Sequence, residues 1–102
     1  MAYIGKVKVS KEWTTLVSLI QSQVEGQSAF SFDADTTYQL QGETDSGVRL
    51  VEMSSTPDDR REGNRIVGTQ VAFYVKDTPD LYVRAVAEYG DQCLLKISTT
   101  GD

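Results

Sequence analysis

Apolar and polar residues alternate with a period of two in short runs along most of this 102-residue chain. Gly, Asp, Asn, Pro and Ser separate the runs. Because successive side chains of a strand point to opposite faces, this pattern predicts an all-β domain with tight connections, built from about seven or eight strands. The predicted strands are 3–9, 29–33, 37–41, 48–54, 69–76, 81–88 and 92–99.

The same alternation predicts which side chains of each strand face the core. In the run 69–76, Val71, Phe73 and Val75 are expected to point inward, and Gln70, Ala72 and Tyr74 are expected to point outward. The other residues expected on inward faces are Tyr3, Val7, Val9, Phe30, Phe32, Tyr38, Leu40, Leu81, Val83, Ala85, Ala87, Cys93, Leu95 and Ile97.

One segment near the N-terminus has helical rather than strand periodicity. Its apolar residues, spaced at i, i+3, i+4, i+7 and i+11, form one helical stripe. Ser10 is a suitable N-cap before this segment, and Gly26 is a suitable stop signal after it. We therefore predict one short N-terminal helix that docks on the sheets. The stripe consists of Trp13, Leu16, Val17, Ile20 and Val24.

Antiparallel strands with short connections can bury their inward faces by stacking two sheets or by closing into a barrel. We favour an antiparallel β-sandwich, with barrel-like closure as the alternative. The length of 102 residues suits a single domain that spans 1–102.

Composition limits the class of partner. The formal charge of −5 disfavours binding to nucleic acid, which requires a clustered basic face. No apolar run approaches the roughly 18 residues of a membrane span, and the first residues, "MAYIGKVKVSKEW", lack the apolar core of a signal peptide. The chain is therefore expected to be soluble and to bind neither nucleic acid nor membrane.

The residue types do not favour catalysis. Histidine is absent, which removes the commonest general base and metal ligand. Cys93 is expected to be buried and inert, and Asp33 and Asp35 are expected to form an Asx-type turn. Adjacent carboxylates such as Asp58 and Asp59 seldom reach the roughly 5–10 Å separation that glycoside hydrolysis needs. We predict no catalytic residues, no metal site and no cofactor.

Two groups of residues are candidates for partner contact. Tyr82 and Arg84 share one face of a strand, and Tyr74 is expected to face outward nearby, so the three side chains could form a small interface patch. The alternative is that Tyr82 and Arg84 cover a sheet face with an intramolecular partner.

The second group lies in the stretch "PDDRREGNRIVG" at 57–68, which carries six charges that sum to zero. Its basic residues are Arg60, Arg61 and Arg65. Exposed loops often hold binding residues, but self-neutralising charges also suit a solvated loop, because each exposed ion pair contributes at most about 1 kcal/mol. Both interpretations stay open.

Several motifs in this order resemble a known family. They are Trp13 followed by Leu16, "YQLQ" at 38–41, "VRLVE" at 48–52, "STP" at 55–57, "VGTQVAFYV" at 67–75, "LYVRA" at 81–85 and "CLLKIS" at 93–98. Together they resemble small β-sandwich structural proteins of tailed bacteriophages and prophages, which are associated with the capsid surface or with head or tail fibres. Gly42 departs from the family pattern, which usually has Asn there.

The resemblance implies a structural role for certain positions and supplies no catalytic set. The positions that it marks as architectural are Trp13, Leu16, Tyr38, Gln41, Pro57, Gly63, Tyr82 and Arg84. It implies a non-enzymatic virion protein, made in the host-cell cytoplasm, which docks on other capsid or fibre proteins as a homo-oligomer or in many copies. The alternative is a small module that binds a peptide or a glycan, and an acidic hydrolase is the least favoured interpretation.

Overall fold

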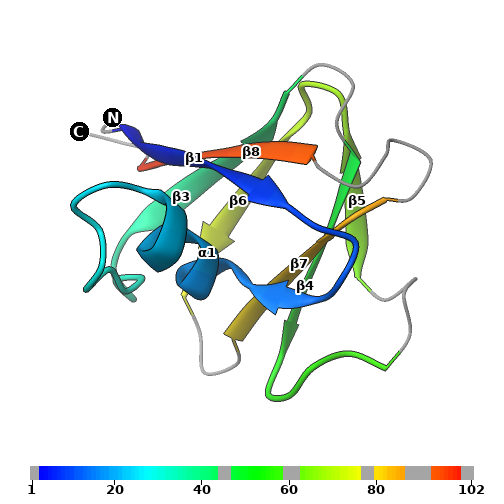
Figure 1. Cartoon of the computed structure of the whole chain (residues 1–102), viewed down its shortest axis with the longest axis horizontal. Helices are drawn as coiled ribbons and strands as arrows, with labels where there is room; N and C mark the ends of the chain where they lie inside the picture. The colour runs from blue at the N-terminus through cyan, green and yellow to red at the C-terminus, as the bar shows by residue number, and fades with distance from the viewer. Residues whose placement is uncertain (1–2, 44–46, 59–62, 77–79, 87–92, 100–102) are drawn as a thin grey trace.

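The computed structural model describes residues 3–43, 47–58, 63–76, 80–86 and 93–99, which form eight strands and one helix (Figure 1). The predicted strand 29–33 is replaced by an irregular segment, whereas a two-residue strand precedes the helix. The elements are β1 (Tyr3–Val9), β2 (Thr14–Thr15), α1 (Leu16–Gln23), β3 (Thr37–Gly42), β4 (Gly47–Met53), β5 (Asn64–Val67), β6 (Val71–Val75), β7 (Asp80–Ala85) and β8 (Cys93–Thr99).

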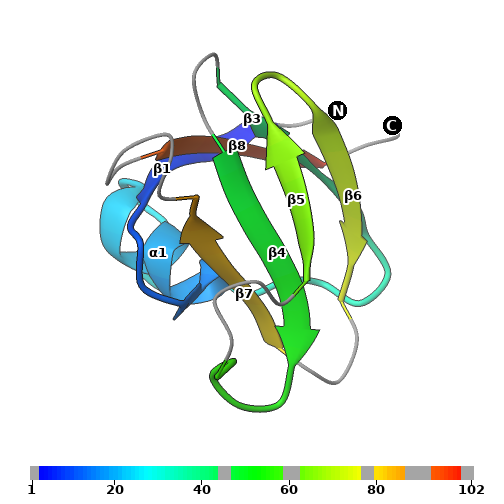
Figure 2. The ribbon, with the colours of Figure 1, turned by 90° about the vertical axis from the view of Figure 1, so that its right-hand side faces the viewer.

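The strands form two antiparallel sheets of four strands each. The first sheet has the order β1-β8-β3-β6, and the second has the order β2-β7-β4-β5. The sheets stack on a shared apolar core, and the described strands do not close into a barrel (Figure 2). The prediction of an antiparallel sandwich with one short helix is therefore confirmed.

The inward faces of most strands follow the predicted alternation. Val7 and Val9 of β1 are buried while Lys6 and Lys8 are exposed, and the buried residues of β8 include Cys93. Tyr3 is an exception, because it is 63% exposed at the end of β1, beyond a register shift between Tyr3 and Gly5. The fully buried core side chains are Leu16, Ile20, Leu40, Leu95, Ile97, Val7, Val9, Val48, Val83 and Cys93.

The helix is shorter than the stripe predicted, and its N-cap is Thr15 instead of Ser10. The reason is that Thr14 and Thr15 pair with Val83 and Tyr82 of β7, so this part of the backbone is extended and hydrogen-bonded within the second sheet. β-branched residues favour such a strand. The carbonyl of Ser10 instead accepts a hydrogen bond from the Ala85 N–H at 2.7 Å.

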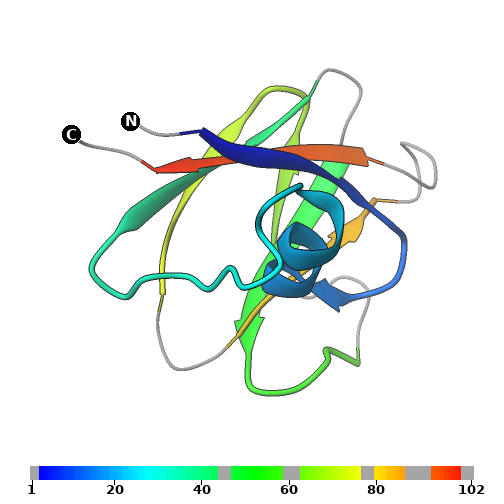
Figure 3. The same ribbon diagram turned by 60° about the vertical axis from the view of Figure 1, so that its left-hand side comes forward.

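Helix α1 closes one side of the sandwich. It packs against β1 of the first sheet and β7 of the second, and it buries Leu16 and Ile20 completely (Figure 3). The opposite side of the sandwich is formed by the edge strands β5 and β6, which a turn at 68–70 connects. The two sides therefore differ, because a helix covers the first, whereas the second consists of the edge strands of the two sheets.

The segment 29–33 was predicted as a strand, and this prediction is wrong. Its backbone bonds to turns and side chains, since the Phe30 N–H donates to the Gln27 carbonyl and the Asp33 N–H donates to the Tyr38 hydroxyl at 2.7 Å. Phe30 and Phe32 do pack against the core, as expected, with their ring centroids 5.0 Å apart in an edge-to-face arrangement. Two aromatic side chains of an irregular segment therefore cover this part of the core in place of a strand, and Phe30 and Phe32 are called the aromatic lid below.

Candidate interaction surface

The three residues predicted to form an exposed tyrosine and arginine patch are all buried. Tyr74, Tyr82 and Arg84 retain 4%, 9% and 4% of their exposure. The outward placement of Tyr74 is therefore wrong, and these side chains offer no free surface to a partner. Arg65 is exposed on β5, while Arg60 and Arg61 lie outside the described residues.

Arg84 is held by the segment that leads into β2. Its Nε–H donates to the Lys11 carbonyl at 2.9 Å, and its guanidinium carbon lies 5.9 Å from the centre of the Trp13 ring. Trp13 is half-buried over the outer face of the second sheet, where it covers this cation. Arg84 therefore has intramolecular partners, as the alternative to an interface patch predicted, and it joins the N-terminal segment to β7.

The remaining architectural positions also have defined places in the fold. Tyr38 and Pro57 are buried, and the Gln41 side chain donates to the Thr69 carbonyl at 3.2 Å. Gly63 has a φ of +78°, and a Cβ at this position would collide with the Leu50 carbonyl oxygen. Glycine therefore suits position 63 for two separate reasons, its backbone conformation and the close approach of β4.

The side chains with catalytic potential have structural contacts. Cys93 is buried, and its sulfur accepts a hydrogen bond from the Gly47 N–H at 3.4 Å. Asp33 accepts from the Asp35 N–H at 3.0 Å, so the expected Asx-type turn is present. Within the described ranges, no three His, Cys, Asp or Glu side chains gather in a metal-binding group, and no helix is long and apolar enough to span a membrane.

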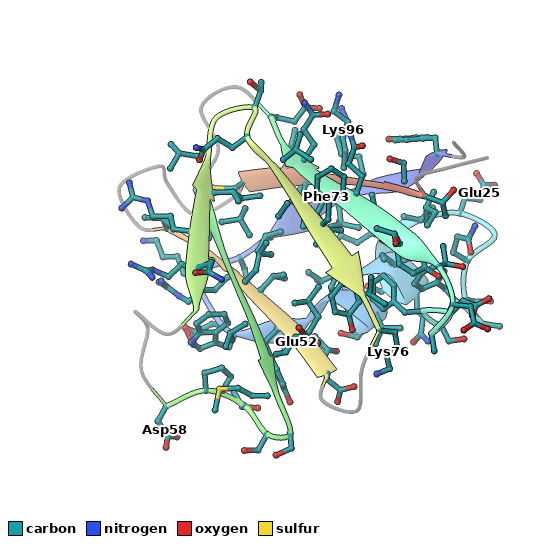
Figure 4. The ribbon with its side chains drawn as sticks, turned by 180° about the vertical axis from the view of Figure 1, so that it is seen from behind. Glu25, Glu52, Asp58, Phe73, Lys76 and Lys96 are labelled. Atoms are coloured by element: carbon teal, nitrogen blue, oxygen red, sulfur yellow. The ribbon has the colours of Figure 1, made fainter. Side chains whose placement is uncertain are left out.

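Among the described residues, one face of β6 carries three of the four large hydrophobic side chains that are exposed. Val71, Phe73 and Val75 are 40%, 68% and 50% exposed, which reverses the predicted parity of this strand (Figure 4). The reason is that Tyr74 packs edge-to-face on Phe32 at 4.9 Å and lies 6.5 Å from the Tyr38 ring. The aromatic lid thus determines which face of β6 turns inward.

The backbone of β6 has an equally defined orientation. The Gly42 N–H donates to the Gln70 carbonyl, and the Glu43 N–H donates to the Leu94 carbonyl. In an antiparallel ladder, alternate residues direct both backbone groups to the same neighbour. The register of β3 with β6 and β8 therefore directs the N–H and C=O groups of Ala72 and Tyr74 toward β3, and those of Val71, Phe73 and Val75 away from it.

The other three sheet edges carry features that block pairing with another strand. On β1, the Gln23 side chain accepts from the Lys8 N–H at 2.8 Å and donates to the Lys8 carbonyl at 3.0 Å. β2 has two residues, and β5 has four, of which Arg65 is an exposed charge. Short length, charge and irregularity are common protections of edges. β6 has five residues, "VAFYV", without a charge, a proline or a glycine.

A cavity of about 220 Å³ lies between the sheets beside β5 and β6. Most of its lining is apolar and comes from both sheets. The residues that line it are Leu40, Leu50, Val51, Glu52, Gly63, Asn64, Ile66, Ala72, Phe73, Tyr74 and Leu81. A second cavity of about 200 Å³ lies near the aromatic lid, and Lys76 and Asp80, whose charged groups are 3.7 Å apart, are among its lining residues.

A charged cluster lies on the outer face of the first sheet. The Lys6 ammonium is 3.0 Å from the Glu43 carboxylate, and the Lys96 ammonium is 3.9 Å from the same oxygen. The hydrogen bond from Lys6 lowers the pKa of Glu43 below its ordinary value of 4.5, and the same bond raises the pKa of Lys6 above 10.5. Lys6 is exposed and Glu43 is partly exposed, so this cluster resembles a surface ion-pair network.

Comparison of the chain with protein-family models, with curated proteins and with solved structures gave no match. The candidate surface therefore rests on the geometry of β6. Sequence reasoning missed this surface because it assigned Val71, Phe73 and Val75 to the core. A usable signal was present in the uncharged run "VAFYV", which lacks the charges seen on β1 and β5.

Proposed function

We propose that this chain is a non-enzymatic structural protein of a tailed bacteriophage or prophage particle. It docks on other virion proteins as a capsid decoration or as a head or tail fibre component, in multiple copies. The observation that carries the proposal is the β6 strand, which combines an exposed apolar face with an edge that no described strand pairs. Its place in the cell is then the host cytoplasm during synthesis and the virion afterwards.

A monomer leaves the apolar side chains on the outer face of β6 in contact with water, which is unfavourable. Phe73 leaves on the order of 100–170 Å² in water, if a whole aromatic side chain buries about 150–250 Å². Val71 and Val75 extend this area along the strand. Contiguous exposed apolar area and an open strand edge are both features of surfaces that bind other proteins. A docking role therefore accounts for residues that folding of the single chain leaves exposed.

The assignment to a virion is supported by the sequence resemblance. The order Trp13, "YQLQ", "STP" and "LYVRA" resembles that of the phage structural family, and Tyr38, Pro57 and Arg84 from these motifs are buried in the sandwich. The Arg84 side chain of "LYVRA", for example, contacts Lys11 and Trp13. The resemblance thus supplies the biological setting, and β6 supplies the surface.

The alternative is a small module that binds a peptide or a glycan. The cavity beside β6 favours the peptide version, because an extended peptide that pairs with this edge would place side chains next to Leu40, Ile66 and Leu81. Tyr74, Tyr82 and Arg84 form the face that was predicted to contact either ligand, and their burial removes this face for a peptide and a glycan alike. Screening the folded chain against peptide and glycan arrays distinguishes this alternative, since a structural protein is expected to bind neither.

Mass spectrometry of purified particles tests the proposal. Particles should contain the chain in many copies when they are prepared from a lysate of the phage, or of the induced prophage, that carries the gene. The Phe73→Lys variant should be incorporated at a strongly reduced level, whereas Gln39→Lys, on the neighbouring strand and directly opposite Phe73, should be incorporated normally. Consistent absence of the wild-type chain from particles would contradict the virion assignment.

A further inference from the structure

The geometry points to a second copy of this chain as the occupant of the β6 edge: two β6 strands pair antiparallel about a twofold axis at Phe73. This inference rests on the proposed function in one respect, because it names the partner of the same surface. It goes further in specifying the register, the symmetry and the residues that meet.

The backbone groups of β6 match a twofold centred on Phe73. Val71, Phe73 and Val75 direct their N–H and C=O groups to the open edge, so the free groups are distributed symmetrically about the middle residue. In the antiparallel arrangement, Phe73 lies opposite the second Phe73, and Val71 lies opposite the second Val75. Each of these pairs exchanges two hydrogen bonds, which gives about six backbone bonds between the copies.

The side chains of β6 are also complementary to themselves in this register. On the outer face, valine meets valine and phenylalanine meets phenylalanine, and aromatic and β-branched cross-strand pairs stabilise a sheet. On the inner face, Ala72 lies opposite the second Tyr74, so a small side chain meets a large one. A sequence of the form V-A-F-Y-V has this property because its apolar outer face is a palindrome.

Charge favours the same contact. The chain carries a net charge of −5, so two copies repel one another in general. No charge lies within β6, and the flanking residues are Gln70 and Lys76, which would come opposite each other in the paired register. β6 is therefore a place where copies can approach without bringing like charges together, in contrast to β5 with Arg65 and β1 with Lys6 and Lys8.

The expected dimer is weak. Five residues on each side bury on the order of several hundred Å², which is below the roughly 1,200–2,000 Å² of stable complexes. Pairing should therefore be reversible in dilute solution and favoured where copies are held at high local concentration, as on the surface of a particle. This property suits a protein that must stay monomeric until it is assembled.

Sedimentation equilibrium from about 10 μM to about 1 mM tests the dimer directly. The wild-type chain should show a reversible monomer–dimer equilibrium, and Phe73→Lys should weaken it at least about tenfold, because a charge at an edge blocks strand pairing. Gln39→Lys places the same charge on the same face one strand away and should change the constant less than about twofold. Circular dichroism of both variants confirms that they fold.

Disulfide trapping tests the register. Residues directly opposite in a hydrogen-bonded pair have Cα atoms about 5.5 Å apart, which is within the range of a disulfide. Phe73→Cys should therefore form a covalent dimer on mild oxidation, and Gln39→Cys should not. A monomer at every concentration, equal weakening by Gln39→Lys, or a dimer that Phe73→Cys fails to trap would each overturn the inference.

The two proposals fail in different ways. A chain that is found in particles but never dimerises would refute the twofold pairing and leave the virion role standing, with β6 occupied by another virion protein. A chain that dimerises through β6 but is absent from particles would refute the virion role and leave the pairing standing.

Discussion

The guanidinium of Arg84 lies over the ring of Trp13, at 5.9 Å from the ring centre, and its Nε–H donates to the Lys11 carbonyl at 2.9 Å. These contacts join residues more than 70 positions apart in the chain. They attach the segment before β2 to the outer face of the second sheet, and so they hold the start of the helix that closes one side of the sandwich.

The Arg84→Lys substitution tests this attachment. Lysine retains the charge but has no Nε–H in the required position, so the Lys11 carbonyl loses its donor and the ring loses its flat cation. We expect a loss of about 2–3 kcal/mol in the free energy of unfolding, measured by urea denaturation. The matched control is Arg65→Lys on β5, where the arginine is exposed and the change should stay within about 0.5 kcal/mol. Equal effects at both positions would contradict the structural role of Arg84.

A second prediction concerns the close approach of Gly63 to β4. Gly63 and Gly68 both have positive φ, at +78° and +60°, but a Cβ at Gly63 would also collide with the Leu50 carbonyl, whereas one at Gly68 meets nothing within 4 Å. Gly68→Ala should cost about 1 kcal/mol, because alanine is strained in the left-handed region. Gly63→Ala should cost at least about 2 kcal/mol, since the backbone must also move. Thermal denaturation of the two variants measures the difference, and a smaller loss for Gly63→Ala would show that the approach is not tight.

A third prediction tests the facing of β6. Tyr74→Ala removes a ring that packs on Phe32 in the core, and we expect it to cost about 3–5 kcal/mol. Phe73→Ala removes a ring that is 68% exposed, and it should change stability by no more than about 1 kcal/mol. Chemical denaturation of both variants measures the two losses of stability. If Phe73 faced the core and Tyr74 faced the solvent, Phe73→Ala would be the more destabilising of the two.

The difference between β1 and β6 explains how far the sequence could predict this fold. On β1, Lys6 and Lys8 alternate with Val7 and Val9, so one face is charged and the inward face is clear. On β6, both faces are apolar or aromatic, and the count of apolar residues favours the face that the structure exposes. The sandwich, the helix and the buried Cys93 were therefore predictable, but the facing of β6 was not.

The candidate surface depends on contacts between distant segments, which a strand pattern does not contain. Tyr74 turns inward because the rings of Phe32 and Tyr38 stand beside it, and Phe32 belongs to an irregular segment that looked like a strand. Likewise, Arg84 is buried because Trp13 lies over it. Polar or aromatic residues that the strand pattern places on the surface can thus be buried by a segment that is distant in the sequence. The position of that segment is known only from the folded structure.

The last prediction concerns the solvent-accessible pair of Lys6 and Glu43, whose charged groups are 3.0 Å apart. The hydrogen bond from Lys6 holds the pKa of Glu43 below 4.5 in the folded chain. A lowered carboxyl pKa stabilises the fold above the unfolded pKa, and this contribution is lost as the pH falls through the folded pKa. The raised pKa of Lys6 acts in the opposite direction, so its contribution is present below 10.5 and is lost as the pH rises through the folded value.

Comparison of the wild type with Glu43→Gln by thermal denaturation measures this effect. The wild type should have a slightly higher Tm between about pH 6 and pH 8, and the two curves should converge as the pH falls through the lowered pKa of Glu43. Because the pair is exposed, the difference should shrink when the salt concentration rises from about 0.01 M to about 1 M. A difference that persists at low pH or at high salt would show that Glu43 stabilises the sheet by packing, since neither protonation nor screening would remove that contribution.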